Sequence, residues 1–244
     1  QKFISQIMTS KTPVRATEDV DESSLNYAEI KALATGNPLI KEKMDLDNQV
    51  TKLKMLEANY KSNKYSLEDK VTKIYPKEIH KTENLIKRIK EDIGHVEPRP
   101  EGEEKFTSIT INGEKIKDKK LAGEKLLEAI KGLNISEGKV IGEYRNFGIE
   151  VAYNSFANQY TFSLNGEAKH YGVLGTSADG NITRLDNVLD KMLERLEQQE
   201  SKLVTTKEQL ANAKEELKKP FEKEQELQGK VLRLAELNKL LDMG

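Results

Sequence analysis

The chain has 244 residues, of which 33% are charged and only 36% hydrophobic, and its formal net charge is −1. This balance is poor for one thick globular core and typical of long helices in solvent, and the near-zero net charge gives no whole-chain argument for nucleic acid. The absence of cysteine excludes disulfides and thiolate zinc sites. No apolar run approaches the ~20 residues of a membrane span, so no membrane contact is expected. The first residue is Gln rather than Met, which indicates a piece of a longer polypeptide.

Residues 1–23 are expected to form an N-terminal arm, and residues 24–95 the first half of a helical hairpin. The segment Gly36-Asn37-Pro38 should break this half, because Gly can cap the end of one helix and Pro can open the next. Pro76 should kink or restart the second helix, because proline lacks the backbone donor that a helix needs. Between these points apolar residues recur at every seventh position, which is typical of a helix packed along a partner helix. They are Leu46, Leu53, Tyr60, Leu67 and Ile74.

Residues 105–176 change to the alternating pattern of β-strands and are predicted to form a small module. A strand over 106–111 should end at an Asn112-Gly113 turn, and Asp118 should cap a helix to about Leu133. Four further strands are expected. They cover 140–145, 147–153, 160–164 and a segment ending near Val173. Alternation with one polar face indicates an antiparallel sheet covered on one side, with the single helix as its cover. The predicted order is β-α-β-β-β-β.

Residues 181–243 are predicted to return as coiled-coil helices, opened by Asn181 or Thr183 and broken near Pro220. Their leucines fall seven apart, at Leu189, Leu196, Leu203, Leu210 and Leu217. Because the two heptad stretches flank the module symmetrically, we interpret them as halves of one intramolecular hairpin. If Ile93 lies beside Ile182, Ile89 should meet Leu185 or Asp186.

The expected fold class is therefore α+β: a long antiparallel coiled-coil hairpin with a small antiparallel sheet and one helix inserted at its tip. A self-contained hairpin should be monomeric, and pairing of the heptads between chains is the alternative.

The search for catalytic motifs gives no site. The sequence contains no phosphate-binding glycine loop, no H-E-x-x-H and no G-x-S-x-G. His80, His95 and His170 fall in different predicted elements, which is typical of surface histidines rather than of metal ligands. We therefore predict no catalytic residue, no cofactor, no metal and no small-molecule substrate.

Basic and aromatic residues gather in the predicted tip module, which makes it the candidate interaction surface. The candidates are Lys115, Lys117, Lys119, Lys120, Tyr144, Arg145, Lys169 and His170. Such residues on a small sheet can follow a nucleic-acid backbone and stack on bases. The residues alone favour a different interpretation, in which these are ordinary surface side chains that cover a thin core. The reason is that Glu114 and Asp118 dilute the positive charge.

Five stretches of the sequence resemble one protein family. They are SQIMTSK (5–11), SLNYAEIKALATGNPLIKEK (24–43), IGEYRNFGIEVAYNSF (141–156), GNITRLDNVL (180–189) and VLRLAELNKLLDM (231–243). Together they resemble the C-terminal region of the very large proteins of bacterial conjugative elements and phages that join a superfamily 2 (Swi/Snf-type) helicase to a DNA-methyltransferase-like domain. The resemblance covers essentially the whole chain.

This resemblance implies a context rather than a reaction. The family's Walker lysine motif and Asn-Pro-Pro-Tyr-type methyltransferase motif have no counterpart here, so no catalytic residue is carried over. It implies a non-catalytic accessory region of a cytoplasmic DNA-processing protein, whose partners would be DNA and the helicase/methylase core of its own parent chain. The alternative is a structural spacer or protein-docking arm without DNA contact. An independent enzyme is the least supported class.

Overall fold

The computed structural model describes Ala34 and residues 36–100, 106–131 and 138–242. The chain forms two compact units, one of residues 1–66 with 218–244 and the other of residues 67–217. Helices combine with one six-stranded antiparallel sheet, which confirms the predicted α+β class. The predicted N-terminal arm and nearly all of the predicted helix before Gly36 lie outside the described residues.

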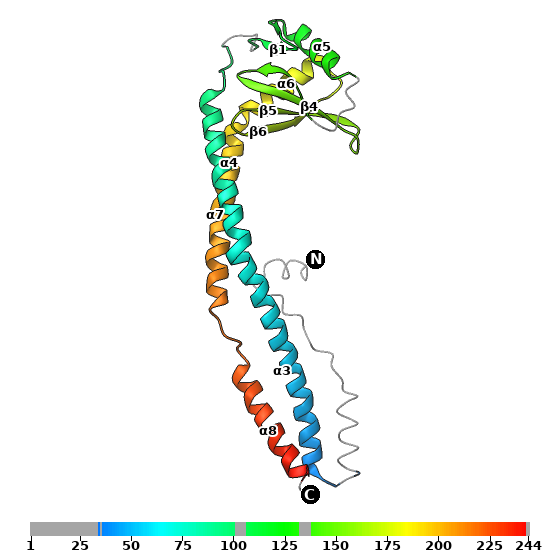
Figure 1. Ribbon diagram of the computed structural model, residues 1–244, viewed down its shortest axis with the longest axis vertical. Helices are drawn as coiled ribbons and strands as arrows, with labels where there is room; N and C mark the ends of the chain where they lie inside the picture. The colour runs from blue at the N-terminus through cyan, green and yellow to red at the C-terminus, as the bar shows by residue number, and fades with distance from the viewer. Residues whose placement is uncertain (1–33, 35, 101–105, 132–137, 243–244) are drawn as a thin grey trace. The chain divides into compact units, whose positions relative to one another are not determined.

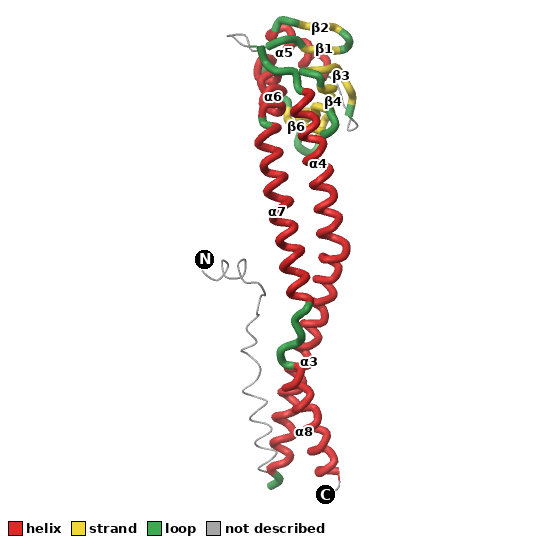
Figure 2. The backbone as a smooth tube through the Cα atoms, turned by 90° about the vertical axis from the view of Figure 1, so that its left-hand side faces the viewer, coloured by secondary structure: helices red, strands yellow, loops and turns green. Residues whose placement is uncertain are grey.

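The first unit is built on helices α3 (Pro38–Asp69) and α8 (Glu224–Asp242), which lie side by side in Figures 1 and 2. The predicted break before α3 is confirmed, since Gly36 has a φ of +65° and the Asn37 side chain accepts a hydrogen bond from the Leu39 amide at 3.0 Å. Val50, Leu53 and Leu227 form the buried contact between the helices. The break predicted near Pro220 is also confirmed, because no helix covers residues 218–223.

A π-helical turn, η1 (Lys70–Ile74), joins α3 to α4 (Tyr75–His95). The Tyr75 amide donates to the Lys70 carbonyl, five residues back. Pro76 lies at the start of α4, where its ring would clash with a carbonyl in the preceding turn of a regular α-helix. The wider π turn shifts the preceding carbonyls and removes this clash. The predicted kink or restart at Pro76 takes the form of a π-helical turn at residues 70–74, after which α4 begins.

In the second unit α4 packs against α7 (Met192–Leu217), as Figures 1 and 2 both show. Ion pairs cross this contact from Glu83 to Lys207 and from Lys90 to Glu200, each at 2.7 Å. The predicted register placed Ile89 beside Leu185 or Asp186. This register is wrong by more than one heptad, because Lys90, the residue after Ile89, pairs with Glu200.

The register differs because the predicted continuous returning helix is two helices. The first is α6 (Ala178–Asp190), with Lys191 as its C-cap. It is capped by Ser177, whose hydroxyl accepts from the Gly180 amide at 3.2 Å, so the predicted cap at Asn181 or Thr183 is wrong. Its apolar face is buried in the core of the module rather than against α4. The buried residues are Ile182, Leu185 and Leu189. Pairing with α4 therefore begins only with α7.

The sheet has the strand order β2-β1-β3-β4-β5-β6, and all neighbours are antiparallel. The strands are β1 (Ile109–Ile111), β2 (Glu114–Ile116), β3 (Lys139–Tyr144), β4 (Phe147–Asn154), β5 (Gln159–Asn165) and β6 (Lys169–Val173). Helix α5 (Lys119–Ile130) follows β2, and its predicted cap is confirmed by a 2.7 Å hydrogen bond from the Leu121 amide to Asp118.

Two parts of the predicted module order are wrong. The sheet has an additional strand, β2, and a second covering helix, α6. Asn112 and Gly113 both have positive φ, at 49° and 85°, which is the geometry of a two-residue hairpin turn that needs a strand on each side. The order is therefore β-β-α-β-β-β-β followed by α6. Strand β2 was missed because three residues are too few to show the alternation of apolar and polar side chains.

Gly123 marks the closest approach of α5 to α6, and its replacement tests this packing. A Cβ atom at Gly123 would lie 2.4 Å from the Ala178 carbonyl oxygen, so Gly123→Ala must push the two backbones apart. We expect a loss of about 1–3 kcal/mol in the free energy of unfolding, measured by urea denaturation. At Gly94 in α4 a Cβ would meet nothing within 4 Å, so Gly94→Ala should instead be neutral or stabilising by up to about 1 kcal/mol. Equal effects at the two positions would contradict the packing.

Candidate functional site

The eight residues singled out in the sequence fall into an exposed group and a buried group. Four exposed lysines lie at one corner of the sheet, on the edge strand β2, in the segment after it and in the first turn of α5. They are Lys115, Lys117, Lys119 and Lys120. Across the described part of the chain, no ion pair or hydrogen bond engages their ammonium groups. Lys169 is also exposed, but it pairs with Glu150 at 2.7 Å. Of the eight, only the β2–α5 lysines are therefore exposed and unengaged.

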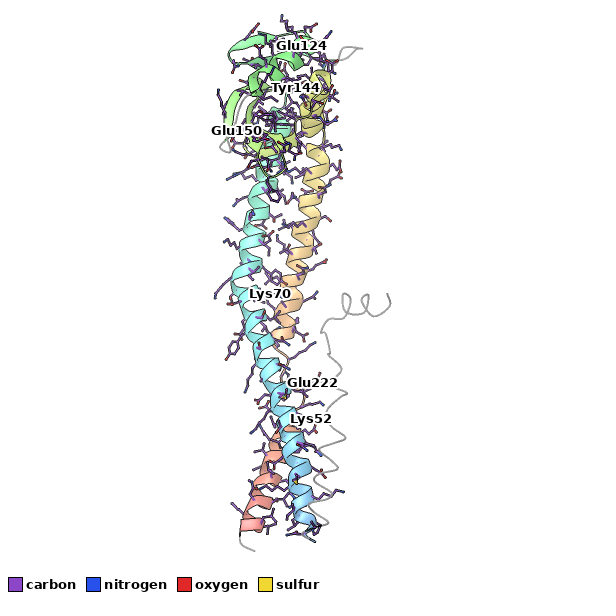
Figure 3. All side chains as sticks on the ribbon, turned by 90° about the vertical axis from the view of Figure 1, so that its right-hand side faces the viewer. Lys52, Lys70, Glu124, Tyr144, Glu150 and Glu222 are labelled. Carbon is purple, nitrogen blue, oxygen red and sulfur yellow. The ribbon has the colours of Figure 1, made fainter. Side chains whose placement is uncertain are left out.

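Tyr144 and Arg145 do not belong to the exposed surface, because they are 1% and 7% exposed. Tyr144 lies inside the module, whereas the labelled Glu150 lies toward its surface (Figure 3). Arg145 occupies the β3–β4 turn with a φ of +48°, and its side chain points to α6. Its guanidinium donates to Asp190 at 2.9 Å and contacts Asp186 at 3.4 Å. The prediction that these two residues contact a partner is wrong.

The Arg145 cluster is closed by four further interactions. The Arg145 Nε atom donates to the Glu97 carbonyl at 2.7 Å, and the Tyr144 hydroxyl donates to Asp186 at 2.7 Å. Burial, and then the Asp186 carboxylate, raise the pKa of Tyr144 far above its usual range. Arg99, from the segment after α4, pairs with both Asp186 and Asp190. Two arginines thus neutralise two carboxylates of α6 and fix this helix to the β3–β4 turn.

His170 is also buried, with 1% of its surface exposed. Its Nε2 atom lies 2.8 Å from an Asp92 oxygen, and its Nδ1 atom lies 2.9 Å from a guanidinium nitrogen of Arg195. Because arginine can only donate, Nδ1 accepts that hydrogen bond and Nε2 carries the proton that is donated to Asp92. Burial, and then the Arg195 charge, lower the pKa of His170. The ring is therefore neutral and fully bonded, and the prediction that His170 is a surface contact is wrong.

Asp92 connects this cluster to the β5–β6 turn. One carboxylate oxygen accepts from the Glu167 amide at 2.7 Å, and the other accepts from the Ala168 amide at 2.9 Å. Arg195 also donates to the Lys169 carbonyl at 3.0 Å. The cluster thus attaches the hairpin turn to α4 through Asp92 and to α7 through Arg195. No atom of the His170 ring is left to act as an acid or a base.

The neutral state of His170 should be visible in the pH dependence of stability. In the unfolded chain a histidine has a pKa of about 6.5 and takes up a proton that the buried ring does not. The free energy of unfolding should therefore fall as the pH drops below about 6.5, by at most about 1.4 kcal/mol per pH unit, until the folded-state pKa is reached.

Urea denaturation between about pH 7.5 and pH 5.5, around the unfolded-state pKa, measures this slope. His170→Gln should flatten the slope. The control His80→Gln changes an exposed residue whose ring contacts only the Asn84 side chain, so it should leave the slope unchanged. A wild-type slope in His170→Gln would contradict the assignment.

The described residues contain no group of three His, Cys, Asp or Glu side chains placed to hold a metal ion. No described helix is long and apolar enough to span a membrane.

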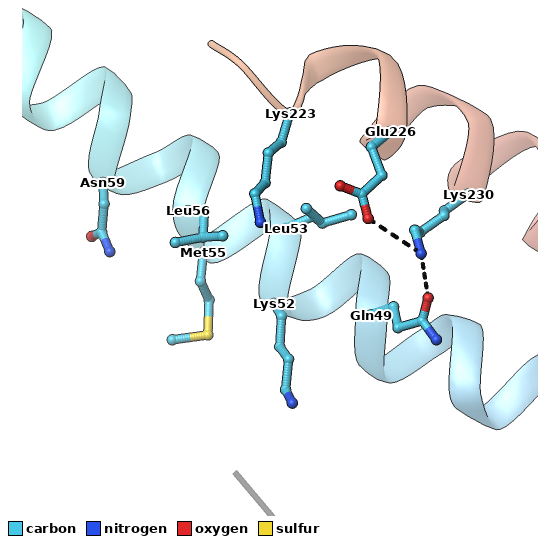
Figure 4. A pocket seen from close by; sticks show the side chains of 9 residues that line it. All are labelled: Gln49, Lys52, Leu53, Met55, Leu56, Asn59, Lys223, Glu226 and Lys230. Carbon is cyan, nitrogen blue, oxygen red and sulfur yellow. Dashed lines mark hydrogen bonds and ion pairs between the residues drawn. The ribbon is translucent and has the colours of Figure 1, made fainter. Parts of the chain in front are cut away.

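A cavity of about 390 Å³ lies between α3 and α8 (Figure 4). Its apolar wall is formed by Leu53, Met55 and Leu56. The Lys230 ammonium at its rim is engaged by Glu226 at 3.3 Å and by Gln49.

A second cavity, an open groove of about 480 Å³, runs beside β6. It is lined by residues of β6, α6 and α7. They are His170, Tyr171, Asn187, Val188, Lys191, Glu194, Arg195 and Gln198.

Comparison of the chain with protein-family models, with curated proteins and with solved structures finds no match. The resemblance to the helicase–methyltransferase proteins therefore stays a prediction.

Proposed function

We propose that this chain is a non-catalytic accessory region of a large DNA-processing protein, in which the β-rich module contacts the DNA backbone. The observation that carries the proposal is the group of exposed, unengaged lysines at the β2–α5 corner, Lys115, Lys117, Lys119 and Lys120. Lysine ammonium groups bind phosphates as point charges, independently of base sequence. The expected contact therefore positions DNA rather than reading its sequence.

The placement of these lysines also costs stability, which favours a functional role. Lys119 and Lys120 occupy the first turn of α5, where the helix dipole is positive and acidic residues are favoured. The acidic N-cap residue, Asp118, accepts a hydrogen bond from the Leu121 amide. A phosphate at this corner would relieve the repulsion.

The parent protein is proposed from the sequence resemblance. It would be a helicase/methylase of a mobile element in the cytoplasm, with the parent's own helicase/methylase core as a second partner. The antiparallel pair α4–α7 carries the module within the second unit, so it would act as the arm that presents the lysines. The chain itself would be monomeric.

DNA binding can be measured by fluorescence anisotropy with a short labelled duplex. Four phosphate contacts predict that the affinity falls about a hundredfold between 50 mM and 200 mM salt. Replacing the four lysines together by glutamine should remove most of this binding and most of its salt dependence. Lys169→Gln is the matched control, because Lys169 is already paired with Glu150. No binding at about 50 mM salt, or equal binding by the four-lysine variant, would reject the proposal.

The second candidate function is a protein-docking arm without DNA contact. It is favoured by a different observation, the groove beside β6.

A further inference from the structure

The two edges of the sheet differ in how they are protected. The β2 edge is three residues long and exposes the charged Glu114 and Lys115. The β6 edge is longer, and after the exposed Lys169 at its start it exposes uncharged side chains, with Tyr171 at 69% and Val173 at 41%. Proteins usually blunt sheet edges with short strands and charged residues, because a bare edge can pair with another strand. By this criterion β2 is protected, whereas the middle of β6 is not.

The backbone of β6 offers hydrogen-bonding groups along this edge. The Leu174 amide donates to the Tyr160 carbonyl of β5 at 2.9 Å. Because alternate residues bond to the same neighbour in an antiparallel ladder, Gly172 also faces β5, while Tyr171 and Val173 direct their N–H and C=O groups away from the sheet. Within the described chain, no hydrogen bond engages these outward groups.

Helices α6 and α7 form the far wall of the groove beside this edge. The wall carries the cation Lys191 and one acidic side chain, Glu194, whereas the charge of Arg195 is balanced by Asp92 across the His170 ring. Arg184, one turn before Asn187 on α6, extends the positive charge, since its guanidinium lies 3.0 Å from the position of a Cβ at Gly175, just beyond β6. The groove therefore combines a free strand edge with a wall of net positive charge.

We propose that the β6 edge binds an extended acidic peptide segment of a partner protein as a seventh strand. The outward N–H and C=O groups require a partner with a matching backbone ladder, which a peptide has and a nucleic acid lacks. Side chains of the added strand alternate in direction, so acidic residues at every second position would face Lys191 and Arg184. The positive wall also favours an acidic segment over a second copy of the chain, because the β6 edge of a second copy would bring the same cations.

This site is independent of the DNA proposal, because the β2–α5 lysines lie at the opposite edge of the sheet. The two proposals therefore fail separately. The four-lysine glutamine variant should bind the peptide like the wild type, and variants of β6 should bind DNA like the wild type.

The probe is a fluorescent six-residue peptide of alternating valine and aspartate, with acetylated and amidated ends, measured by anisotropy with the full chain. Val173→Pro removes one outward donor and should weaken binding about tenfold. Lys115→Pro removes the corresponding outward donor from the other edge and should have no effect. Lys191→Glu should weaken binding at least tenfold, whereas Lys120→Glu should not. In amide NMR spectra the largest shifts on binding should occur at Tyr171 and Val173.

Five results would overturn the proposal. The first is no binding at about millimolar concentration, and the second is binding that Val173→Pro leaves unchanged. The third is equal binding of a peptide in which lysine replaces aspartate, which would remove the charge argument. The fourth is a dimer of the chain that Val173→Pro dissociates, which would make a second copy the occupant of the edge. In the fifth, a single-stranded oligonucleotide displaces the peptide from the wild type but not from Lys191→Glu. This result would make a nucleic acid, rather than a peptide, the occupant of the groove.

Discussion

Replacing Asp92 by alanine should lower the free energy of unfolding of the second unit by about 3–5 kcal/mol. Asp92 is 2% exposed, and its carboxylate accepts hydrogen bonds from Glu167, Ala168 and His170. The truncation leaves these buried donors without an acceptor and leaves the Arg195 charge, at the other side of the His170 ring, without its counter-charge. Urea denaturation followed by circular dichroism measures the loss.

Two comparisons show whether this loss arises at the cluster. Glu91→Ala changes the neighbouring residue, whose carboxylate lies 3.9 Å from the Lys87 ammonium in an exposed pair, and it should cost less than about 0.5 kcal/mol. In the Asp92 variant the Glu167 and Ala168 amides should also exchange with solvent faster than in the wild type. A loss below about 1 kcal/mol, with unchanged exchange at these two amides, would show that Asp92 does not hold the turn.

The strands of the module were the most predictable part of the fold. In β4 and β5 apolar residues recur at every second position, and most of them are buried, as in Ile149, Val151, Phe162 and Leu164. This alternation depends only on the geometry of a strand. The same rule places His170 on the inner face, since it pairs with the buried Leu164. The alternation within β6 alone points the other way, because its apolar residues Tyr171 and Val173 are exposed, so the burial of His170 follows from the strand pairing.

The helical register could not be predicted from the heptads alone. Ile182, Leu185 and Leu189 recur at the spacing of a helix that packs on one side, and this spacing suits a sheet as well as a partner helix. The break at Lys191 has no glycine or proline to mark it. Because the residues of α6 pack in the core of the module, the contact of the returning chain with α4 begins later in the sequence, at α7. This shift accounts for the error of more than one heptad in the predicted register.

The candidate site was predicted in part, for a related reason. Exposed lysines beside a hairpin turn and a helix cap are local features, and their positions follow from the turn and the cap. The direction of Arg145 depends on a positive φ in the β3–β4 turn and on Asp186 and Asp190 of a distant helix. Such pairing is a tertiary property, which residue type and spacing do not encode.

Replacing Arg145 by alanine should cost about 3 kcal/mol in the free energy of unfolding, because it leaves the buried Asp186 carboxylate with less positive charge nearby. Arg99 also contacts Asp186, at 3.4 Å, and this second cation keeps the loss at the lower end of the range for a broken buried pair. The exposed pair of Lys169 with Glu150 is the matched control, and Lys169→Ala should cost less than about 1 kcal/mol.

A double-mutant cycle separates the Arg145–Asp186 interaction from the loss of packing around the arginine stem. If the buried charge causes the destabilisation, Arg145→Ala combined with Asp186→Ala should cost at least about 1 kcal/mol less than the sum of the two single changes. Strict additivity would mean that the two side chains act independently, and that α6 is held to the β3–β4 turn by its apolar contacts alone. The expected coupling instead makes Arg145 the residue that orients α6. Through α6 it also positions Lys191 beside β6, so the Arg145→Ala chain should bind the acidic peptide more weakly while its Lys115 corner still binds DNA.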